Sequence, residues 1–240
     1  AGTGTHDNGS YIDHPNTDGQ LRGLFPFGIC RAEQFGAVGN ETADNASELQ
    51  AFAAFISTYD GEAVIGGGIF LSTANPVLPI SGTGVVLRGA GMGKTILRQS
   101  GDVSRGSLQF TGDTIDTVIS DITFDGPAFS GGAHEMKNVT LERCRFTTDP
   151  NTLVNGIKFV ADNMNIGIRD LKLIDCRIEN CGRMGIELQN HGNTTYKISG
   201  VEIIRCHIIG SGQANASLGM GISLTGDGEG ALIQDCYFDG

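Results

Sequence analysis

The stretch Val139-Thr-Leu-Glu-Arg-Cys-Arg-Phe146 decides the fold, because its pattern returns along the chain. The further copies are Leu171-Lys-Leu-Ile-Asp-Cys-Arg-Ile178, Val201-Glu-Ile-Ile-Arg-Cys-His-Ile208, Ala231-Leu-Ile-Gln-Asp-Cys-Tyr-Phe238 and, with Ile122 at the cysteine position, Thr117–Phe124. Counted from the cysteine, apolar residues recur at positions −5, −3, 0 and +2. Two pairs with a period of two, separated by one extra residue, indicate two short strands that meet at a bend.

A second repeat lies between the copies of the first one. It reads Gly156-Ile-Lys-Phe, Gly185-Ile-Glu-Leu and Gly221-Ile-Ser-Leu. The anchor positions 122, 144, 176, 206 and 236 are separated by steps of 22, 32, 30 and 30 residues. Each period holds about three short strands, which cannot bury their apolar face alone but form a continuous core when they stack. The pattern predicts an all-β chain that winds as a right-handed parallel β-helix, rather than a sandwich with hairpin turns about every 8–12 residues.

Stacked coils align equivalent side chains about 4.8 Å apart, which is the spacing of hydrogen-bonded strands. We expect an inward column of free thiols, because parallel side chains do not converge to disulfide geometry. Its members are Cys144, Cys176, Cys206 and Cys236. The residues just before the anchors alternate in sign and predict a ladder of surface ion pairs. They are Asp121, Arg143, Asp175, Arg205 and Asp235. No CxxC pair or histidine group accompanies the cysteines, so we expect no metal site.

Composition and charge exclude several classes of protein. The 240 residues include 37 glycines and carry a formal net charge of −11. An acidic surface repels nucleic acid and anionic membranes, so we expect neither as a partner. No window approaches the roughly 18 uninterrupted apolar residues of a membrane-spanning helix. The first residues lack an apolar core segment, so we expect no signal peptide in this chain.

The sequence predicts one amphipathic helix, over residues 44–59, with Leu49, Phe52, Phe55 and Ile56 on one face. A helix placed ahead of the first coil would cover its open apolar end, as solenoids require. We expect three regions: an N-terminal connector over 1–28, an opening strand with the capping α-helix over 29–60, and parallel β-helix coils over 61–240. The last coil has no recognisable cap, so we expect the chain to be truncated at its C-terminus.

The segment Phe35-Gly-Ala-Val-Gly-Asn-Glu-Thr-Ala-Asp-Asn-Ala-Ser-Glu-Leu-Gln-Ala-Phe52 resembles the opening motif of pectate-lyase-superfamily β-helices, roughly FGAxGDGxxDDTxAxQxA. The stretch from His6 to Gly28 resembles the connector that precedes the β-helix in bacteriophage tailspikes. This resemblance implies a tailspike-like depolymerase that acts on a bacterial surface polysaccharide or exopolysaccharide. It also implies a homotrimer in a phage virion tail or outside the cell. Lyases, hydrolases, epimerases and inert structural proteins share the motif, so it does not fix the reaction.

Candidate catalytic residues follow from the glycine-led strands. Glycoside hydrolysis uses two carboxyl groups, about 5–5.5 Å or about 6.5–9.5 Å apart, and stacked coils supply such distances. We expect even offsets from the glycine to face outward, which makes Glu187, with Asp162 or Asp227, an acid/base pair, and Glu179 a further catalytic candidate. The expected sugar-binding residues are His191, Lys158, Asn190, Gln189 and Arg177. The alternative is that Asp, Asn and His simply favour turns after strands.

Two functions of different class remain open. The first is an enzyme that depolymerises a polysaccharide by hydrolysis or β-elimination. We expect this enzyme to need no cofactor, although a lyase could use Ca²⁺ to neutralise the carboxylate of a uronate. The second is a non-catalytic tail-fibre module that binds glycan or trimerises. The absence of Trp and the presence of only four Tyr leave few platforms for sugar stacking, which argues against an active site on this chain alone, and the expected truncation favours the second reading. A uronan epimerase is a weaker third possibility, because the acid-Pro-His-Glu signature of such enzymes is not found.

Overall fold

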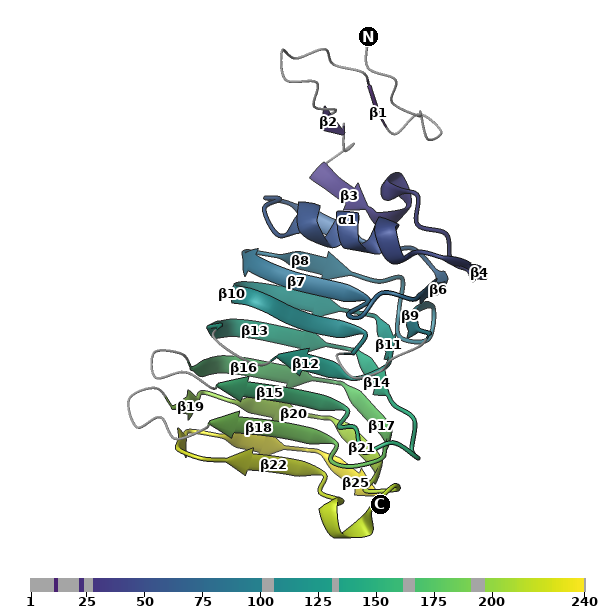
Figure 1. Ribbon diagram of the computed structural model, residues 1–240. Coiled ribbons are helices and arrows are strands. Elements are labelled where there is room, and N and C mark those ends of the chain that lie inside the picture. The colour runs from purple at the N-terminus through teal and green to yellow at the C-terminus, as the bar shows by residue number, and fades with distance from the viewer. Residues whose placement is uncertain are drawn as a thin grey trace.

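The computed structural model describes residues 11–12, 22–23, 28–100, 106–130, 134–161, 167–190 and 197–239. Its strands lie one above another as the rungs of a single stack, with helix α1 (Ala46–Ile56) across one end (Figure 1). Every described strand pair within the stack is parallel, and each rung pairs with the rung one coil away. The chain is therefore a parallel β-helix, and the predicted fold class is confirmed.

Two sheets form the walls of the stack. The 8-stranded sheet contains β4 (Asn40–Asp44), β6 (Gly68–Ser72), β9 (Thr95–Gln99), β11 (Thr123–Asp125), β14 (Arg145–Thr147), β17 (Arg177–Cys181), β21 (His207–Ser211) and β25 (Tyr237–Asp239). The 15-stranded sheet contains β3 (Ile29–Arg31), β5 (Glu62–Val64), β7 (Leu78–Thr83), β8 (Val86–Arg88), β10 (Leu108–Ser120), β12 (Ala128–Ser130), β13 (Met136–Glu142), β15 (Ile157–Ala161), β16 (Ile168–Ile174), β18 (Ile186–Asn190), β19 (Ile198–Ser199), β20 (Glu202–Ile204), β22 (Ile222–Thr225), β23 (Gly228–Glu229) and β24 (Leu232–Gln234). Two short 3-10 turns, Ala32–Phe35 and Ala216–Leu218, and an antiparallel pair, β1 (Tyr11–Ile12) with β2 (Arg22–Gly23), complete the described elements. Most of the expected connector over 1–28 lies outside the described residues.

Residues that occupy equivalent positions in the sequence repeats are paired in neighbouring strands. Leu141 pairs with Leu173, and Leu173 pairs with Ile203. In the other sheet Phe146 pairs with Ile178, which pairs in turn with Ile208. These side chains are almost fully buried, so the alternation in the sequence is the alternation between core and surface.

The extra residue that separates the two short strands of the first repeat lies at a corner of the coil, where the chain turns from one sheet to the other. The residue before each anchor has a left-handed backbone, with φ of 62°, 48°, 53°, 51° and 54° at Asp121, Arg143, Asp175, Arg205 and Asp235. A second left-handed position lies five residues earlier, at Asp116, Asn138, Asp170, Gly200 and Gly230. Asp, Asn and Gly tolerate this region best, which explains the residue types at most of these positions. The predicted ion-pair ladder forms in part: Arg143 Nε lies 2.8 Å from Asp121 Oδ1 and Arg205 Nε lies 2.7 Å from Asp175 Oδ1, whereas the described ion pairs do not link Arg143 to Asp175 or Arg205 to Asp235.

The thiol column is confirmed. Cys144, Cys176 and Cys206 are fully buried, and Cys236 at the last rung is partly exposed. All six cysteines are free. Each thiol of the column donates to a backbone carbonyl of the preceding coil; the distance from Cys176 Sγ to the Leu141 oxygen is 3.3 Å, for example. The cysteines therefore pack as small apolar residues and also satisfy carbonyls at the corner.

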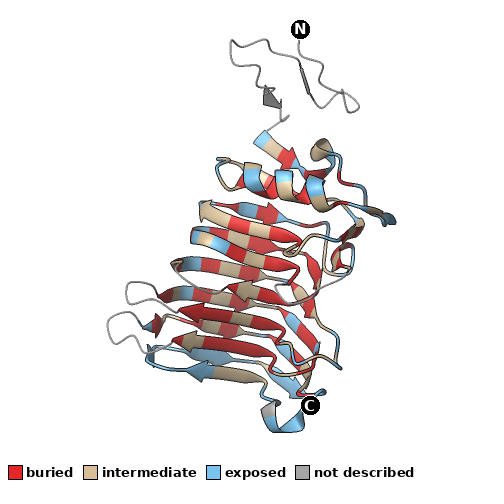
Figure 2. Ribbon diagram, in the orientation of Figure 1, coloured by how far each residue is buried: buried red, intermediate tan, exposed pale blue. Residues whose placement is uncertain are grey.

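Helix α1 covers the first coils, as predicted. Its own residues Leu49, Phe52, Ala53 and Ile56 are buried, whereas Phe55 is only partly buried and packs against the core. Buried positions run through the rungs as a continuous band, whereas β22 and β25 at the opposite end are largely exposed (Figure 2). In the part of the chain that the structure describes, no helix has the length and apolar character needed to cross a membrane.

Candidate functional site

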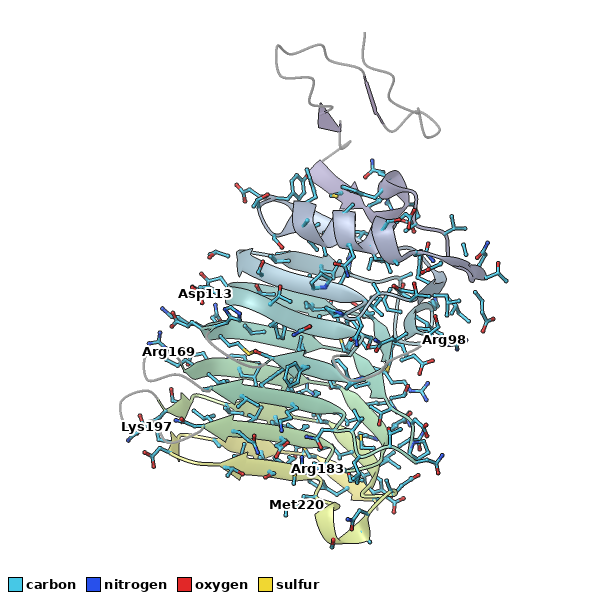
Figure 3. All side chains as sticks on the ribbon, viewed as in Figure 1. Arg98, Asp113, Arg169, Arg183, Lys197 and Met220 are labelled. Atoms are coloured by element: carbon cyan, nitrogen blue, oxygen red, sulfur yellow. The ribbon has the colours of Figure 1, made fainter. Side chains whose placement is uncertain are left out.

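The solvent side of β9, β11, β14, β17, β21 and β25, here called the outer face, carries a group of charged and polar side chains that could bind a ligand. Leu97, Phe124, Phe146, Ile178 and Ile208 point into the core, so the residues directly before and after each of them point away from it. The strand register aligns one set of flanking residues into a row, here called the outer row. It consists of Thr123, Arg145, Arg177, His207 and Tyr237. Arg98 points outward from the same sheet, on the opposite side of the stack from Arg169 (Figure 3).

Glu179 joins the two arginines of the outer row. Arg145 Nε lies 2.7 Å from Glu179 Oε2, and Arg177 Nε lies 2.7 Å from Glu179 Oε1. The carboxylate is only 7% exposed, while about two fifths to half of each arginine side chain reaches solvent. Two positive charges and one negative charge leave this cluster with a net positive charge. The expected catalytic residue Glu179 and the expected binding residue Arg177 are thus in direct contact.

Asp125 is the centre of a second network on the outer face. Arg98 Nε donates to Asp125 Oδ2 at 2.7 Å, and Thr147 Oγ1 donates to Asp125 Oδ1 at 3.0 Å. Arg98 also forms an ion pair with Glu41. The hydrogen bond with Asp125 is the main reason that the pKa of Arg98 lies above its ordinary value. Asp125 is therefore held in one orientation by partners from two neighbouring coils.

Two hollows lie along this sheet. The first, here called the aspartate cavity, has a volume of ≈ 230 Å³ and is lined by Gln99, Asp125, Gly126, Pro127, Thr148, Asp149, Thr152 and Val154. The second, here called the arginine cavity, has a volume of ≈ 250 Å³ and is lined by Met92, Gly93, Arg145 and Arg177. Both hollows include outward residues of the 8-stranded sheet. A third hollow, of ≈ 250 Å³, lies on the 15-stranded sheet at its C-terminal rungs and is lined by Ile198, Leu224, Thr225, Gly226, Gly228, Glu229, Gly230 and Ala231.

Sequence reasoning missed Asp149 and Gln99. Asp149 belongs to no repeat, because it lies in the turn between β14 and β15. A signal was present: twelve residues separate Cys144 from Gly156, whereas nine separate Cys176 from Gly185. Longer loops on a rigid scaffold are where binding and catalytic residues concentrate.

The expected group around Glu187 assembles, but Glu187 is 1% exposed, so the expectation that it faces solvent is wrong. Its Oε1 accepts a hydrogen bond from Gln189 Nε2 at 2.6 Å, and its Oε2 lies 3.2 Å from Lys158 Nζ. Asn155 Nδ2 and Arg183 Nη1 also reach Oε2, at 2.5 and 3.7 Å. The side chain does leave the core face of β18, but residues from the two preceding turns cover it.

The remaining expected residues are dispersed. Asn190 is 3% exposed and donates to the backbone oxygen of Asp227 at 3.5 Å, while Asp227 itself is exposed. Asp162 and His191 lie outside the described residues. Glu179 and Arg177 belong to the 8-stranded sheet, whereas Glu187, Lys158, Gln189 and Asn190 belong to the 15-stranded sheet. The catalytic and sugar-binding roles of all these residues stay predictions.

Comparison with known proteins identifies relatives by structure alone, since no family model and no curated protein matches the chain. The tailspike protein gp49 of Acinetobacter baumannii bacteriophage Fri1, a capsular polysaccharide depolymerase, is 13% identical with a TM-score of 0.50, over 99% of this chain and 54% of that one. ORF18 of Geobacillus virus E2 is 15% identical with a TM-score of 0.53, over 94% of this chain and 54% of that one. The A-module of the mannuronan C-5 epimerase AlgE4 from Azotobacter vinelandii is 15% identical with a TM-score of 0.37, over 88% of this chain and 95% of that one.

The chain thus spans about half the length of the two phage proteins that it matches. Sequence identities this low show a shared fold but do not show a shared substrate or reaction. The stacked parallel rungs, the aligned thiols and the matches to the two phage proteins agree on one statement: the chain is a β-solenoid with a parallel β-helix fold.

Proposed function

We propose that this chain binds and cleaves a bacterial surface polysaccharide that lies along the outer face. The observation that carries this proposal is the outer row, which places Arg145, Arg177, His207 and Tyr237 on successive rungs beside two hollows. Successive rungs are about 4.8 Å apart, a spacing comparable to the length of one sugar in an extended glycan. The ring centroids of His207 and Tyr237 lie 5.7 Å apart and form the largest ring surface of the row.

The structural match to gp49 supports the same class of ligand, because that tailspike is a capsular polysaccharide depolymerase. A protein that meets such a polysaccharide works at the bacterial surface, so we place this chain in a phage virion tail or outside the cell. Assembly as a homotrimer is part of this proposal. Size-exclusion chromatography with light scattering tests it, and a monomer at micromolar concentration would contradict it.

For cleavage we favour hydrolysis by the two carboxylates that line the aspartate cavity. A glycosidase needs one carboxyl group that protonates the leaving oxygen and a second that attacks the sugar or activates water. Asp149 is exposed, and its Oδ1 accepts hydrogen bonds from Asn151. Asp125 is held by Arg98 and Thr147. We assign Asp149 the acid role because it is exposed and has no ion pair among the described contacts, and Asp125 the second role because its ion pair with Arg98 favours the carboxylate form.

The group around Glu187, with Asp162 or Asp227, remains the second candidate for the cleavage step, together with Glu179. A β-elimination would need a cation or basic side chains beside a uronate. Among the described residues, no three His, Cys, Asp or Glu side chains are grouped so that they could hold a metal ion. These residues do not fit a dedicated Ca²⁺ site, so the proposal routes no step through one.

The test incubates the purified chain with a panel of neutral and acidic bacterial capsular and extracellular polysaccharides. Binding is measured by calorimetry, and cleavage by new reducing ends and by the absorbance of unsaturated uronates. Reducing ends without unsaturation support hydrolysis, and both together indicate a lyase. Binding without either product indicates a binding module, a function favoured by the fact that Asp125 and Glu179 are each paired with arginine. Absence of binding across the panel overturns the proposal.

A further inference from the structure

We infer that Arg145 and Arg177 form a subsite for one oxyanion substituent of the glycan, a carboxylate, sulfate or phosphate group, and that the neighbouring sugars are neutral. The ligand is then a heteropolysaccharide in which acidic groups are sparse, not a polyuronate with a carboxylate on every sugar. This inference rests on the proposed function and names the class of polysaccharide.

The geometry of the guanidinium groups carries the first step. Each arginine directs Nε and Nη2 toward Glu179. A guanidinium has five N–H donors, so this contact leaves three on each arginine for a ligand: the two N–H groups of Nη1 and the second N–H group of Nη2. Among the described contacts, neither Nη1 has a partner. The two side chains are 39% and 48% exposed and line the arginine cavity, so an oxyanion from solvent can reach both.

Glu179 explains why the arginines are already in place. Its carboxylate is 7% exposed and accepts from both guanidinium groups, which fixes them on adjacent rungs in the absence of ligand. Preorganised donors bind a ligand more tightly because less side-chain freedom is lost on binding. The same carboxylate repels an incoming anion. Glu179 is therefore a positioning residue that limits the subsite to a net charge of +1.

The rest of the outer row explains why only one charged group fits. His207 and Tyr237 present rings on the rungs that follow Arg177, and Thr123, on the rung before Arg145, is 3% exposed and accepts from the Gly93 nitrogen. None of the three carries a guanidinium or ammonium group. The chain as a whole carries a formal net charge of −11, which repels a polyanion over its full length. One oxyanion gains two charge-assisted contacts at the arginines, whereas further oxyanions along the same strand meet repulsion without a partner.

The experiment uses the polysaccharide of the panel that binds, together with matched derivatives. Three derivatives each lack one kind of oxyanion: the first has its carboxyl groups reduced to hydroxymethyl groups, the second has its sulfate groups removed by solvolysis, and the third has its phosphate groups removed by hydrofluoric acid. The derivative that binds more weakly than the parent glycan identifies the oxyanion. Polygalacturonate serves as the probe with a carboxylate on every sugar. We expect removal of the oxyanion to weaken binding about tenfold or more, and polygalacturonate to bind more weakly than the parent glycan.

Three variants separate this subsite from a general effect of charge. R177Q should weaken binding about tenfold and make affinity insensitive to removal of the oxyanion. E179Q removes the charge that repels the oxyanion and keeps an amide oxygen that can still accept from an arginine, so binding should tighten severalfold, which loss of structure cannot imitate. R143Q removes an arginine whose partner is Asp121, outside the outer face, and should leave affinity unchanged. If R177Q does not fold, R177K keeps the charge, and we expect an intermediate loss because an ammonium group cannot bind bidentately.

Two results would overturn the inference and leave the proposed function intact. One is a glycan that binds equally well after all three removals, and the other is tightest binding by a neutral glycan or by polygalacturonate. Failure of every polysaccharide to bind would overturn the proposed function and this inference together.

Discussion

A Cβ placed on Gly185 would lie only 2.5 Å from Cγ2 of Ile208, a side chain of the next coil. The same relationship holds at Gly156, where the distance to Ile178 Cγ2 would be 2.4 Å, and at Gly221, where the distance to the Phe238 ring would be 2.6 Å. The glycine that opens each copy of the second repeat is therefore required by packing. The inward residue of the following 8-stranded-sheet rung occupies the space that any larger residue would need.

Replacement of Gly185 by alanine should lower the free energy of unfolding by about 1–3 kcal/mol, which is the usual cost of an added methyl group in a packed core. Chemical denaturation followed by circular dichroism measures this change. Gly67 is the matched control, since its nearest neighbours would be 3.8 Å from an added Cβ. Equal stability of the two alanine variants would show that Ile208 can move aside.

The repeating strands could be predicted from the sequence because every coil must bury the same alternating side chains. Val139 and Leu171 were aligned by their pattern, and the register pairs them. The burial of Glu187 was not accessible in this way. It depends on Asn155 and Arg183, which lie in turns of unequal length and have no counterpart in a repeat. The aspartate cavity was missed for the same reason, since Asp149 lies in such a turn.

Stability should fall as the pH rises above about 9. Burial raises the pKa of Cys144 and of Cys181 to about 12 in the folded chain. Between the ordinary thiol pKa and this value, the unfolded chain loses protons that the folded chain keeps, so unfolding becomes easier with rising pH. Each such thiol contributes on the order of 1 kcal/mol per pH unit in this window. Denaturation between pH 8 and 11 measures the slope, and C144A should reduce it; an unchanged slope in that variant would contradict the assignment.

Cys236 should be the first thiol to react in the folded chain. It is partly exposed at the last rung, whereas the five other cysteines are buried. The thiolate is the reactive form, and access limits its reaction. Titration with Ellman's reagent at pH 8 should release about one equivalent quickly and the rest only in denaturant. The C236S variant should remove the fast phase; several fast equivalents in the native chain would show that the thiol column opens.

Asn45 should be essential for the first coil. It is 1% exposed, and its Oδ1 accepts from the Val38 nitrogen at 2.6 Å, while its Nδ2 donates to the Leu71 oxygen at 3.1 Å. The N45A variant removes four side-chain hydrogen bonds, with the Val38 nitrogen and oxygen, the Ala43 oxygen and the Leu71 oxygen, and each is worth about 0.5–1.5 kcal/mol. We expect a loss of about 2–4 kcal/mol, measured by denaturation. Asn40 is the exposed control, and N40A should cost less than about 1 kcal/mol because water can replace its hydrogen bonds.

Two substitutions decide which sheet carries cleavage. D149N removes an exposed carboxylate of the aspartate cavity, so we expect kcat to fall by about 10²–10⁴-fold, the usual contribution of a general acid, with an unchanged melting temperature. E187Q leaves Lys158 and Arg183, each 29% exposed, without their buried counter-charge. Because water still reaches both cations, we expect a loss of about 1–3 kcal/mol of stability, below the full cost of breaking a buried pair, and retained cleavage well below the melting temperature.

The measurement is the rate of new reducing ends on the polysaccharide that the unmodified chain cleaves. D60N, which alters an exposed aspartate near the capping helix, should behave like the unmodified chain. The opposite pattern, with cleavage lost in E187Q at full stability and kept in D149N, would place the catalytic pair on the 15-stranded sheet. In that case the covered carboxylate of Glu187 would have to become accessible on binding, since the glycan could otherwise not reach it.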